Sequence, residues 1–485
     1  MKFNISLSKF KKNHKRKKNQ IIFSKNKCKN YNKFENLFKF LLVEKNSFIF
    51  ESVEKGKIRG RYSIIGLNCD QQWDIKKNNI SIEFKNRKRK IKGNPLVFLN
   101  KLINNFKVEI PSTLPNMSSM LVGYFSYDII RYVENIRDKC LDDLKIPDVR
   151  LLRPSTLIIY DNVKKSIYYI ENIFADTPIK NYNDRYNSIK KSFEFYEDLQ
   201  KITLPEKFTY KKNKNKIKSN ISKSKFLQNV LKAKNYIKKG DIFQVVLSQR
   251  FERKFHKSPL EIYLHLRKTN PSPFMFYFNF KDFKVLGSSP EILVRLRNNT
   301  VTIRPIAGTR PRGKSKNQDH KFSKDLLSDK KELAEHLMLL DLGRNDVGKV
   351  SKVNSVKVTE KFNIEKYSHV MHIVSNVEGK FNNKTSIIET LLSGFPAGTV
   401  SGAPKIRAME IIDELEKNKR KLYAGGIGYF TPTKEFDTCI ALRTALIKKD
   451  KIYVQSGAGI VADSKPNKEY VETVNKAAAL LKSTD

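Results

Sequence analysis

The spacing of hydrophobic and polar positions changes near the middle of the chain. Up to residue 206, short apolar runs bounded by Pro, Asn and Asp predict β-strands. These runs are 61–66, 119–127 and 155–160. Farther on, apolar residues recur at helical spacing over 224–238, which predicts a helix that Gly240 ends.

The second half of the chain mixes helices with strands. Helices are predicted over 330–342, 404–415 and 468–481, the second of them capped by Ser401. Strands are predicted over 242–247, 285–287, 301–303, 364–377, 426–430, 438–447 and 452–457. Because the two types do not alternate strictly, the pattern favours an α+β or layered α/β architecture over a Rossmann sheet.

Two basic tracts that lack acidic residues suggest how the chain is organised. Residues 1–34 contain 12 Lys and Arg, and we interpret them as a solvated tail rather than a transit peptide. The second tract spans 207–240, and its Lys-, Asn- and Ser-rich start is typical of a linker. We therefore predict an N-terminal region over 1–206, a basic linker over 207–225 and a catalytic domain over 226–485.

Composition excludes several classes of protein. With 485 residues and 39% hydrophobic content, the chain can bury a large core. It has no apolar run long enough for a membrane helix, and its start lacks the apolar segment of a secretory signal. The cysteines are scattered, which argues against zinc or a disulfide framework and for a reducing compartment. They are Cys28, Cys69, Cys140 and Cys439. We expect a cytoplasmic protein, with a plastid stroma as the alternative.

The formal net charge of +46 raises the possibility of a nucleic-acid partner. The excess consists of 73 Lys against 22 Arg, spread over the whole length together with many Asn and Ile. Nucleic-acid sites rely on Arg forks with interleaved aromatic residues. We therefore attribute the charge to compositional drift and expect no nucleic-acid partner and no membrane association.

Acidic pairs at helical spacing are conspicuous in so basic a chain. Glu332 and Glu335 are three residues apart on one predicted helix, and Glu469 and Glu472 are three apart on the last one. Residues at this spacing share a helix face. If the two faces meet, their carboxylates suit Mg²⁺, which takes oxygen ligands and keeps several waters. The spacing alone also allows two solvated faces paired with lysines.

Other residues point to an anionic ligand. Small residues at 307–309 and 456–459 let backbone N–H groups approach an anionic oxygen closely. Arg443 lies on an apolar strand, where a carboxylate partner is expected. His369 and His372 lie in an apolar segment, where a core role is the commoner one. Together these features suggest a magnesium-dependent enzyme that acts on a small polycarboxylate.

Several long motifs are similar to those of a known family. They are GDIFQVVLSQR (240–250), PIAGTRPRG (305–313), ELAEHLMLLDLGRND (332–346), HVMH (369–372), FPAGTVSGAPK (395–405), YAGGIGY (423–429), DTCIALR (437–443) and QSGAGIVAD (455–463). They cover nearly all of 224–482 in order, and looser similarity extends to 48–66 and 121–149. The chain resembles the chorismate-utilising enzymes, and among them component I, the large subunit, of anthranilate synthase.

This resemblance implies a fold and a reaction. The fold would be a layered α/β sandwich of two packed, mainly antiparallel β-sheets with helices outside. The reaction would convert chorismate and ammonia to anthranilate and pyruvate with Mg²⁺. Glu335 and Glu472 would be the metal ligands with Glu469 beside them, and His372 and Glu332 would be catalytic. The implied chorismate-binding residues are Gly308, Thr309, Thr399, Tyr423, Arg443, Gly457, Ala458 and Gly459.

The resemblance also separates subtypes and implies partners. Isochorismate-forming relatives need a lysine base where this chain has Gln244, and covalent aminodeoxychorismate synthases need a lysine at the place of Ala307. Ammonia is already nucleophilic and needs neither lysine. No cysteine lies in a glutaminase Gly-x-Cys-x-Gly motif, so a separate glutamine amidotransferase subunit (component II), and hence a hetero-oligomer, is expected.

Feedback inhibition by L-tryptophan is a further implication. The matching residues are Ser52, Pro273, Phe274 and Met275. The family has Tyr where this chain has Phe274, and loss of a bonded hydroxyl weakens binding by about 1 kcal/mol. We expect inhibition to be retained. The alternatives are a basic nucleic-acid-binding protein and a catalytically inactive homologue, and the second is disfavoured because the candidate carboxylates, His372 and Arg443 are all present.

Overall fold

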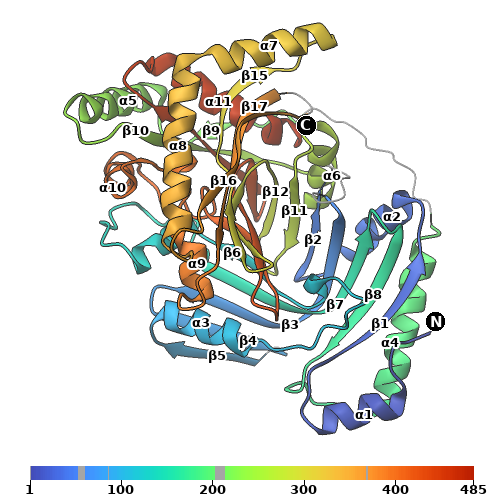
Figure 1. Cartoon of the computed structure of the whole chain (residues 1–485). Coiled ribbons are helices and arrows are strands. Elements are labelled where there is room, and N and C mark those ends of the chain that lie inside the picture. Colours follow the sequence, from blue (N-terminus) through green and yellow to red (C-terminus); the bar gives the residue numbers. More distant parts are fainter. Residues whose placement is uncertain (1, 53–59, 86, 203–212, 368–369) are drawn as a thin grey trace.

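The computed structural model describes residues 2–52, 60–85, 87–202, 213–367 and 370–485, and its main strands pair antiparallel (Figure 1). Two long strands, β3 (Tyr62–Lys76) and β7 (Val149–Asp161), pair with each other along most of their length. Residues 64–66 of β3 pair with one neighbouring strand and residues 71–76 with another. In this way the two long strands belong to two sheets at once.

The first sheet extends from β3 and β7 to both sides. On one side it continues through β8 (Ser166–Ile173) to β1 (Gln20–Lys27). On the other side its order is β2 (Ser47–Glu51), β11 (Phe274–Asn279), β12 (Lys284–Ser289), β21 (Thr444–Lys448), β22 (Lys451–Ile460) and β10 (Gln244–Lys254). The short strands β9 (Lys218–Ser219) and β18 (Gly402–Ala403) pair with β10.

The second sheet starts from the other ends of the long strands. One side carries β4 (Asn79–Phe84) and β5 (Arg87–Lys92). The other side runs through β6 (Leu121–Phe125), β19 (Gly426–Phe430), β20 (Phe436–Ile440), β13 (Ile292–Arg297), β14 (Thr300–Ile303) and β17 (Val370–Lys380). Strands β15 (Ile306–Pro311) and β16 (Lys357–Lys366) complete it beside β17.

Alternation along the strands produces two large cores. Successive side chains of a strand point to opposite faces, so Phe48 and Ile49 of β2 enter different hydrophobic clusters. The cluster of Phe48 contains residues of both sheets, among them Phe278 and Ile427, and so joins the sheets face to face. The cluster of Ile49 lies on the outer face of the first sheet.

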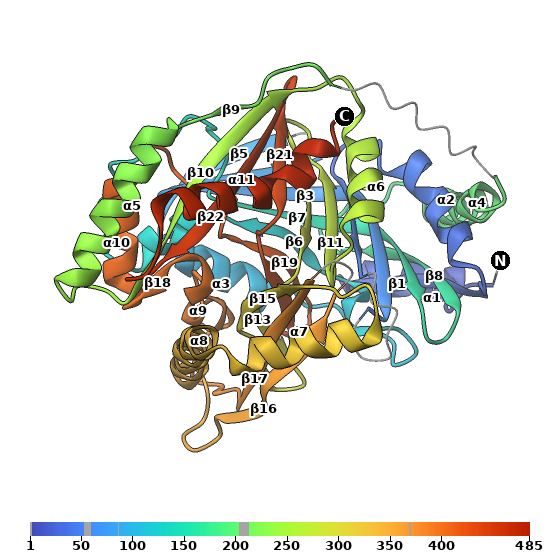
Figure 2. The same cartoon turned by 90° about the horizontal axis from the view of Figure 1, so that it is seen from above.

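Helices cover the outer faces (Figures 1 and 2). The outer face of the first sheet is covered by α1 (Leu7–Lys15), α2 (Tyr31–Leu41), α4 (Tyr182–Leu199) and α6 (Pro259–Thr269). Next to β10 and β22 lie α5 (Lys223–Lys238), α10 (Lys405–Leu415) and α11 (Pro466–Lys482). Helices α7 (Lys316–Ser328) and α8 (Lys330–Gly348) pack on β15 and β17, and α3 (Pro95–Asn105) packs on α9 (Ile387–Ser393). Within the described residues, no helix is long and apolar enough to cross a membrane.

The predicted α+β class with packed antiparallel sheets is confirmed, but four local predictions are wrong. The strand predicted over 364–377 is two antiparallel strands, β16 and β17. The strand predicted over 438–447 is interrupted between β20 and β21, so Arg443 does not lie on a strand.

The basic N-terminal stretch is not a solvated tail, because Phe10, Ile22 and Phe34 are fully buried. Its apolar residues face the core while the lysines between them stay in water. Ser401 does not cap the helix after it, because its hydroxyl donates to the carbonyl of Ala397 and the helix begins at Lys405.

The predicted boundary at 207–225 falls partly outside the described residues. Its described part contains β9 and the first residues of α5. Strands from either side of it pair directly, β2 with β11 and β6 with β19. The N-terminal and C-terminal stretches therefore share both sheets.

Candidate active site

The first wall of the candidate site is the pair of strands β10 and β22. Gln244 opens β10, and Val246 lies opposite Gly459. A Cβ atom at Gly459 would stand 2.7 Å from the Gln244 Nε2 atom, and one at Gly457 would stand 2.6 Å from the Tyr423 hydroxyl. Both glycines are needed because site side chains cross the strand there. Ala458 lies between them, fully buried in the core, so it offers only its backbone to this face.

Helix α8 presents its acidic face to this wall. The Gln244 amide donates to Glu335 Oε1 at 2.8 Å, and that oxygen lies 3.9 Å from the Cβ position of Gly459. Glu332, one turn earlier, approaches Gly308, whose Cβ position is 3.2 Å from Glu332 Oε2. Burial and the charge of Glu335 raise the pKa of Glu332. The helix thus brings two carboxylates next to Gly459 of β22 and Gly308 of β15.

Helix α11 contributes the second pair of carboxylates. Glu472 forms an ion pair with Lys476 at 2.7 Å, and Lys476 Nζ donates to the carbonyl of Gly457 at 3.0 Å. The charge of Glu472 helps to raise the pKa of the buried Tyr423, after burial itself. Burial raises the pKa of Glu469, and the charge of Lys331 on α8 opposes that effect. Side chains of α8 and α11 therefore both approach residues 457–459 of β22.

The carboxylates of α8 and α11 could bind a divalent cation that prefers oxygen ligands. No group of three or more His, Cys, Asp or Glu side chains within the described residues could hold a metal ion by itself. Mg²⁺ is commonly bound through one or two carboxylates, with waters and substrate oxygens completing its shell. Glu335 and Glu472 supply such carboxylates. The pKa of neighbouring Glu332 is raised mainly by burial and then by the charge of Glu335, and a cation would relieve this second effect. The donor set fits Mg²⁺ held together with a substrate.

His372 on β17 closes the site from the side of β15. Its Nδ1 atom lies 2.8 Å from the carbonyl oxygen of Gly308 and 3.1 Å from Thr309 Oγ1. A carbonyl only accepts, so Nδ1 carries the proton and Nε2 is left as an acceptor. Burial is the main cause that lowers the pKa of His372 to about 4; the hydrogen bond to the Gly308 carbonyl opposes the lowering, and the cations of Arg443 and Lys476 contribute to it. The ring is neutral at pH 7. His369, the other histidine of this segment, lies outside the described residues.

Arg443 is held in an unusual way between β20 and β21. Its φ is 45°, in the left-handed region that side chains other than glycine rarely adopt. Within the described residues, no carboxylate pairs with its guanidinium, and burial lowers its pKa. A buried cation without an acidic partner is costly unless a ligand supplies the charge. An anionic ligand would therefore compensate the buried charge of the Arg443 guanidinium.

Glu291 is a buried acid near the site that was not predicted from the sequence. The Thr399 hydroxyl donates to Glu291 Oε1 at 3.0 Å, and the backbone N–H of Ile306 also donates to this carboxyl. Complete burial outweighs these hydrogen bonds and raises the pKa of Glu291 to about 8. The available signal was an acid inside the otherwise apolar run that leads into β13.

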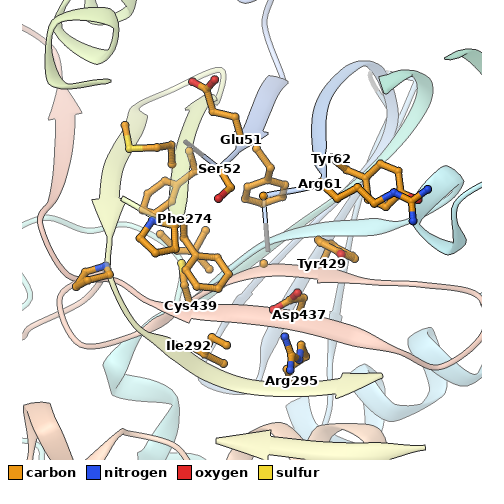
Figure 3. A pocket seen from close by; sticks show the side chains of 18 of the residues that line it. Glu51, Ser52, Arg61, Tyr62, Phe274, Ile292, Arg295, Tyr429, Asp437 and Cys439 are labelled. Carbon is orange, nitrogen blue, oxygen red and sulfur yellow. The ribbon is translucent and has the colours of Figure 1, made fainter. Parts of the chain in front are cut away.

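The four residues expected to bind tryptophan line one cavity of about 150 Å³, away from the acidic helices (Figure 3). They are Ser52, Pro273, Phe274 and Met275. Ser52 Oγ is buried and has no hydrogen-bond partner within the described residues. Asp437 on the facing wall is bound by Arg297 at 3.0 Å, while its Oδ1 atom is unpartnered in the same sense. The cavity therefore offers polar atoms to a ligand within a largely apolar lining.

The comparisons with known proteins agree with this geometry. A family model described as chorismate binding enzyme matches residues 45–482. The chain is 45% identical to anthranilate synthase component 1 of Cereibacter sphaeroides over 99% of this chain and 97% of the relative. It superposes on anthranilate synthase component I from Streptococcus pneumoniae with a TM-score of 0.78 and 37% identity, covering 87% and 92% of the two chains.

A solved structure of lower sequence identity is similar to this chain in fold. The menaquinone-specific isochorismate synthase from Escherichia coli matches with a TM-score of 0.72 at 17% identity, over 99% of both chains. The resemblance to anthranilate synthase component I is confirmed. Because the family model matches most of its length and the Cereibacter sphaeroides relative is 45% identical to it, the chain belongs to the chorismate binding enzyme family.

Proposed function

We propose that the chain converts chorismate and ammonia to anthranilate and pyruvate, the first step of tryptophan biosynthesis. Within the family, the proposal depends on one observation: this chain has the amide of Gln244 where isochorismate-forming relatives need a lysine base. Gln244 lies in the site and donates to Glu335. An amide cannot take a proton from water at neutral pH, so water is not activated at this position. Ammonia carries its own lone pair and needs no such base.

The second position that separates the subtypes supports the same conclusion. Ala307 is buried on β15 next to Gly308, and a methyl group cannot form a covalent adduct with the substrate. Lys476 does lie at the site, but its ammonium is engaged by Glu472 and the carbonyl of Gly457. The chain therefore lacks both lysines by which other members would make isochorismate or a 4-amino product.

Substrate binding follows from the charges of the site. Chorismate is a dianion, and Arg443 is a buried cation that pairs with no carboxylate in the described part of the chain. A bidentate contact with one substrate carboxylate would supply the missing charge. Residues 457–459 of β22 and Gly308 and Thr309 of β15 would approach the remaining anionic oxygens with their backbone. Glu335 and Glu472 would hold Mg²⁺, which offsets repulsion between the substrate and the acidic faces.

Glu291 can donate a proton in this reaction, and His372 can accept one. The hydroxyl at C4 of chorismate leaves as ammonia adds at C2, so it needs a proton. Glu291, with its pKa raised to about 8, stays protonated at neutral pH and can supply one beside Thr399. His372 is neutral with a free Nε2 lone pair, so it accepts a hydrogen bond or a proton. Loss of the C2 proton together with pyruvate then makes the ring aromatic.

A partner subunit supplies the ammonia in this proposal. Glutamine hydrolysis by such enzymes needs an activated cysteine thiolate. Burial raises the pKa of every cysteine of the chain, so that none is a ready thiolate. A glutamine amidotransferase subunit in a hetero-oligomer would provide the missing activity, and free ammonium would replace it in vitro.

L-Tryptophan is the proposed inhibitor, bound in the cavity of Figure 3. The aromatic and apolar lining suits an indole ring. The Ser52 hydroxyl and the Asp437 Oδ1 atom, which have no hydrogen-bond partner among the described residues, suit the polar end of tryptophan. Phe274 offers its ring without a hydroxyl. Glu51, which also lines the cavity, is bound by Tyr31 and Arg267 and acts as part of the scaffold.

One assay tests the proposed reaction. Purified chain with chorismate, Mg²⁺ and ammonium should produce fluorescent anthranilate in equal amount to pyruvate, and chelation of Mg²⁺ should stop it. Co-expression with a component II subunit should add glutamine-dependent activity. Formation of isochorismate or a 4-amino product without anthranilate would refute the assignment, and no turnover at all would favour a catalytically inactive homologue.

A further inference from the structure

Tyr423, one of the residues expected to bind chorismate, lies in the 416–425 connection between α10 and β19. Apart from a bridge at Asn418, this connection pairs with no strand in the described part of the chain. The Tyr423 ring is nevertheless buried, and its hydroxyl lies over Gly457 of the site wall. The position of this ring therefore depends strongly on the side chains around it.

Arg420 is a buried cation beside the same ring. Its Cζ atom lies 5.4 Å from the centroid of the Tyr423 ring and 4.9 Å from that of Tyr127. Its Nε and Nη2 atoms donate to the two oxygens of Glu416 at 2.9 and 2.6 Å, and its side chain is only 1% exposed. A planar guanidinium suits both kinds of partner, a carboxylate and an aromatic face. Arg420 is thus fixed in relation to the tyrosine.

The other hydrogen bonds of Arg420 reach two further parts of the site. Its Nη1 atom donates to the carbonyl of Val400 at 2.7 Å, and its Nη2 atom to that of Val246 at 2.6 Å. Val400 directly follows Thr399, and Val246 belongs to β10, the first wall of the site. One buried cation therefore connects the 416–425 segment with the Thr399 segment and with β10.

Glu416 extends these contacts along β10. Its Oε1 atom accepts hydrogen bonds from the backbone N–H and the hydroxyl of Ser248, both at 2.8 Å. Ser248 lies opposite Gly457, the glycine beneath the Tyr423 hydroxyl. The Arg420–Glu416 pair is therefore bonded to β10 next to the place where the tyrosine crosses the sheet.

A buried ion pair can also serve stability alone, and Arg150 on β7 is an example. It donates to both oxygens of Asp74, at 2.6 and 2.7 Å, and its Cζ atom lies 4.8 Å from the centroid of the Phe283 ring. Its side chain is 4% exposed. Among the described residues, none of its hydrogen-bond partners belongs to the candidate active site. Arg150 thus matches Arg420 in burial and in the type of partner, but not in location.

We propose that Arg420 is a positioning residue for chorismate: together with Glu416, it holds the Tyr423 ring and the Thr399 segment against β10. This inference rests on the proposed function, in which Tyr423 and Thr399 contact the substrate. Arg420→Lys keeps the charge beside Glu416 but loses the planar fork, so it cannot hold all of these parts in one arrangement. A displacement of about 1 Å is enough to impair the contacts of a binding group.

Binding of chorismate in the absence of ammonia measures this role. The dissociation constant is determined by equilibrium dialysis with Mg²⁺, and kcat is then determined from anthranilate formation with ammonium. Arg420→Lys should weaken chorismate binding by at least about tenfold. The value of kcat should fall by a smaller factor, because contacts made equally in the ground and transition states do not affect it. A loss confined to kcat would overturn the inference.

Arg150→Lys is the matched control. Both variants should unfold at a lower urea concentration than the unaltered chain, because each loses a buried fork. Arg150→Lys should nevertheless keep the dissociation constant of chorismate within about twofold of the unaltered value. Equal weakening in both variants would attribute the effect to lost stability and reject a positioning role.

A double-mutant cycle tests whether Arg420 acts through Tyr423. Tyr423→Leu is combined with Arg420→Lys and, separately, with Arg150→Lys. For coupled residues, the combined factor is smaller than the product of the single factors, and we expect a shortfall of at least about threefold with Arg420→Lys. With Arg150→Lys the factors should multiply. Simple multiplication in both combinations would contradict the proposal.

Ser248→Ala replaces Arg420→Lys in the cycle if the latter does not fold. It removes one hydrogen bond to Glu416 and leaves the buried cation in place. Its factor should also fall short of multiplication with that of Tyr423→Leu, by at least about twofold. Independent factors for this pair would likewise reject the positioning role.

The same preparations separate this inference from the proposed function. An unaltered chain that makes anthranilate, with an Arg420→Lys variant that binds chorismate equally well, rejects the inference and leaves the reaction standing. An unaltered chain that makes no anthranilate rejects the proposed function itself.

Discussion

Replacement of Glu291 by glutamine tests whether a buried proton serves the reaction. The carboxyl is fully buried, and its pKa is raised from an ordinary value of 4.5 to about 8. The folded protein therefore binds this proton more tightly than the unfolded chain does. The stability that the group contributes is complete below pH 4.5 and is lost as the pH rises through 8. Glu291→Gln cannot ionise and should not show this loss.

The size of the change in unfolding free energy follows from the difference between the two pKa values of Glu291, 4.5 and about 8. Each unit of pKa difference corresponds to about 1.4 kcal/mol. Between pH 5.5 and 8, the unfolding free energy of the unaltered chain should therefore fall by about 3 kcal/mol relative to that of Glu291→Gln. Glutamine keeps an acceptor for the Thr399 hydroxyl, so its remaining cost should not vary with pH.

Urea denaturation of both chains across this pH range measures the difference, and anthranilate formation measures the catalytic role. Glu291→Gln should lower kcat by about 10²- to 10⁴-fold, the usual contribution of a positioned acid. In the unaltered chain, kcat should decline above pH 8. Glu109→Gln, a change of the same kind at an exposed site, serves as the control. A stability difference that stays flat between pH 5.5 and 8 would refute the reasoning.

Three further substitutions probe other parts of the proposal. Glu335→Gln removes a charge from the proposed metal-binding face and should raise the Mg²⁺ concentration for half-maximal activity by at least about tenfold; an unchanged Mg²⁺ titration would exclude a ligand role. Arg443→Lys keeps the charge but loses the planar fork, so the KM for chorismate should rise by about tenfold; an equal KM would argue against a bidentate contact. Phe274→Tyr should lower the inhibition constant of tryptophan by up to about fivefold if the hydroxyl finds a partner in the cavity; an inhibition constant that rises would show that the ring has no room for it.

Much of the site could be predicted from the sequence because its residues are fixed by short segments. Glu332 and Glu335 share a face through helix geometry alone, and residues 457 and 459 of β22 must be small because side chains of the site cross the strand there. Long motifs then indicated the family and which of its positions carry an amide or a methyl group, Gln244 and Ala307. None of these conclusions required knowledge of which segments pack together.

Other features came only from the tertiary structure, because they depend on contacts between distant segments. The N-terminal stretch read as a solvated tail, yet Phe10 and Ile22 are buried because α4 and β8 provide apolar surfaces for them. The proton on Glu291 is retained through desolvation by segments far away in the chain, and no local pattern records desolvation. Likewise, the contact between Tyr367 and His372 exists because β16 and β17 fold back beside a cavity that β2 and β11 complete. The sequence thus determined which chemical groups are present, whereas the packing of the two sheets decided their charge states and which of them act on one another.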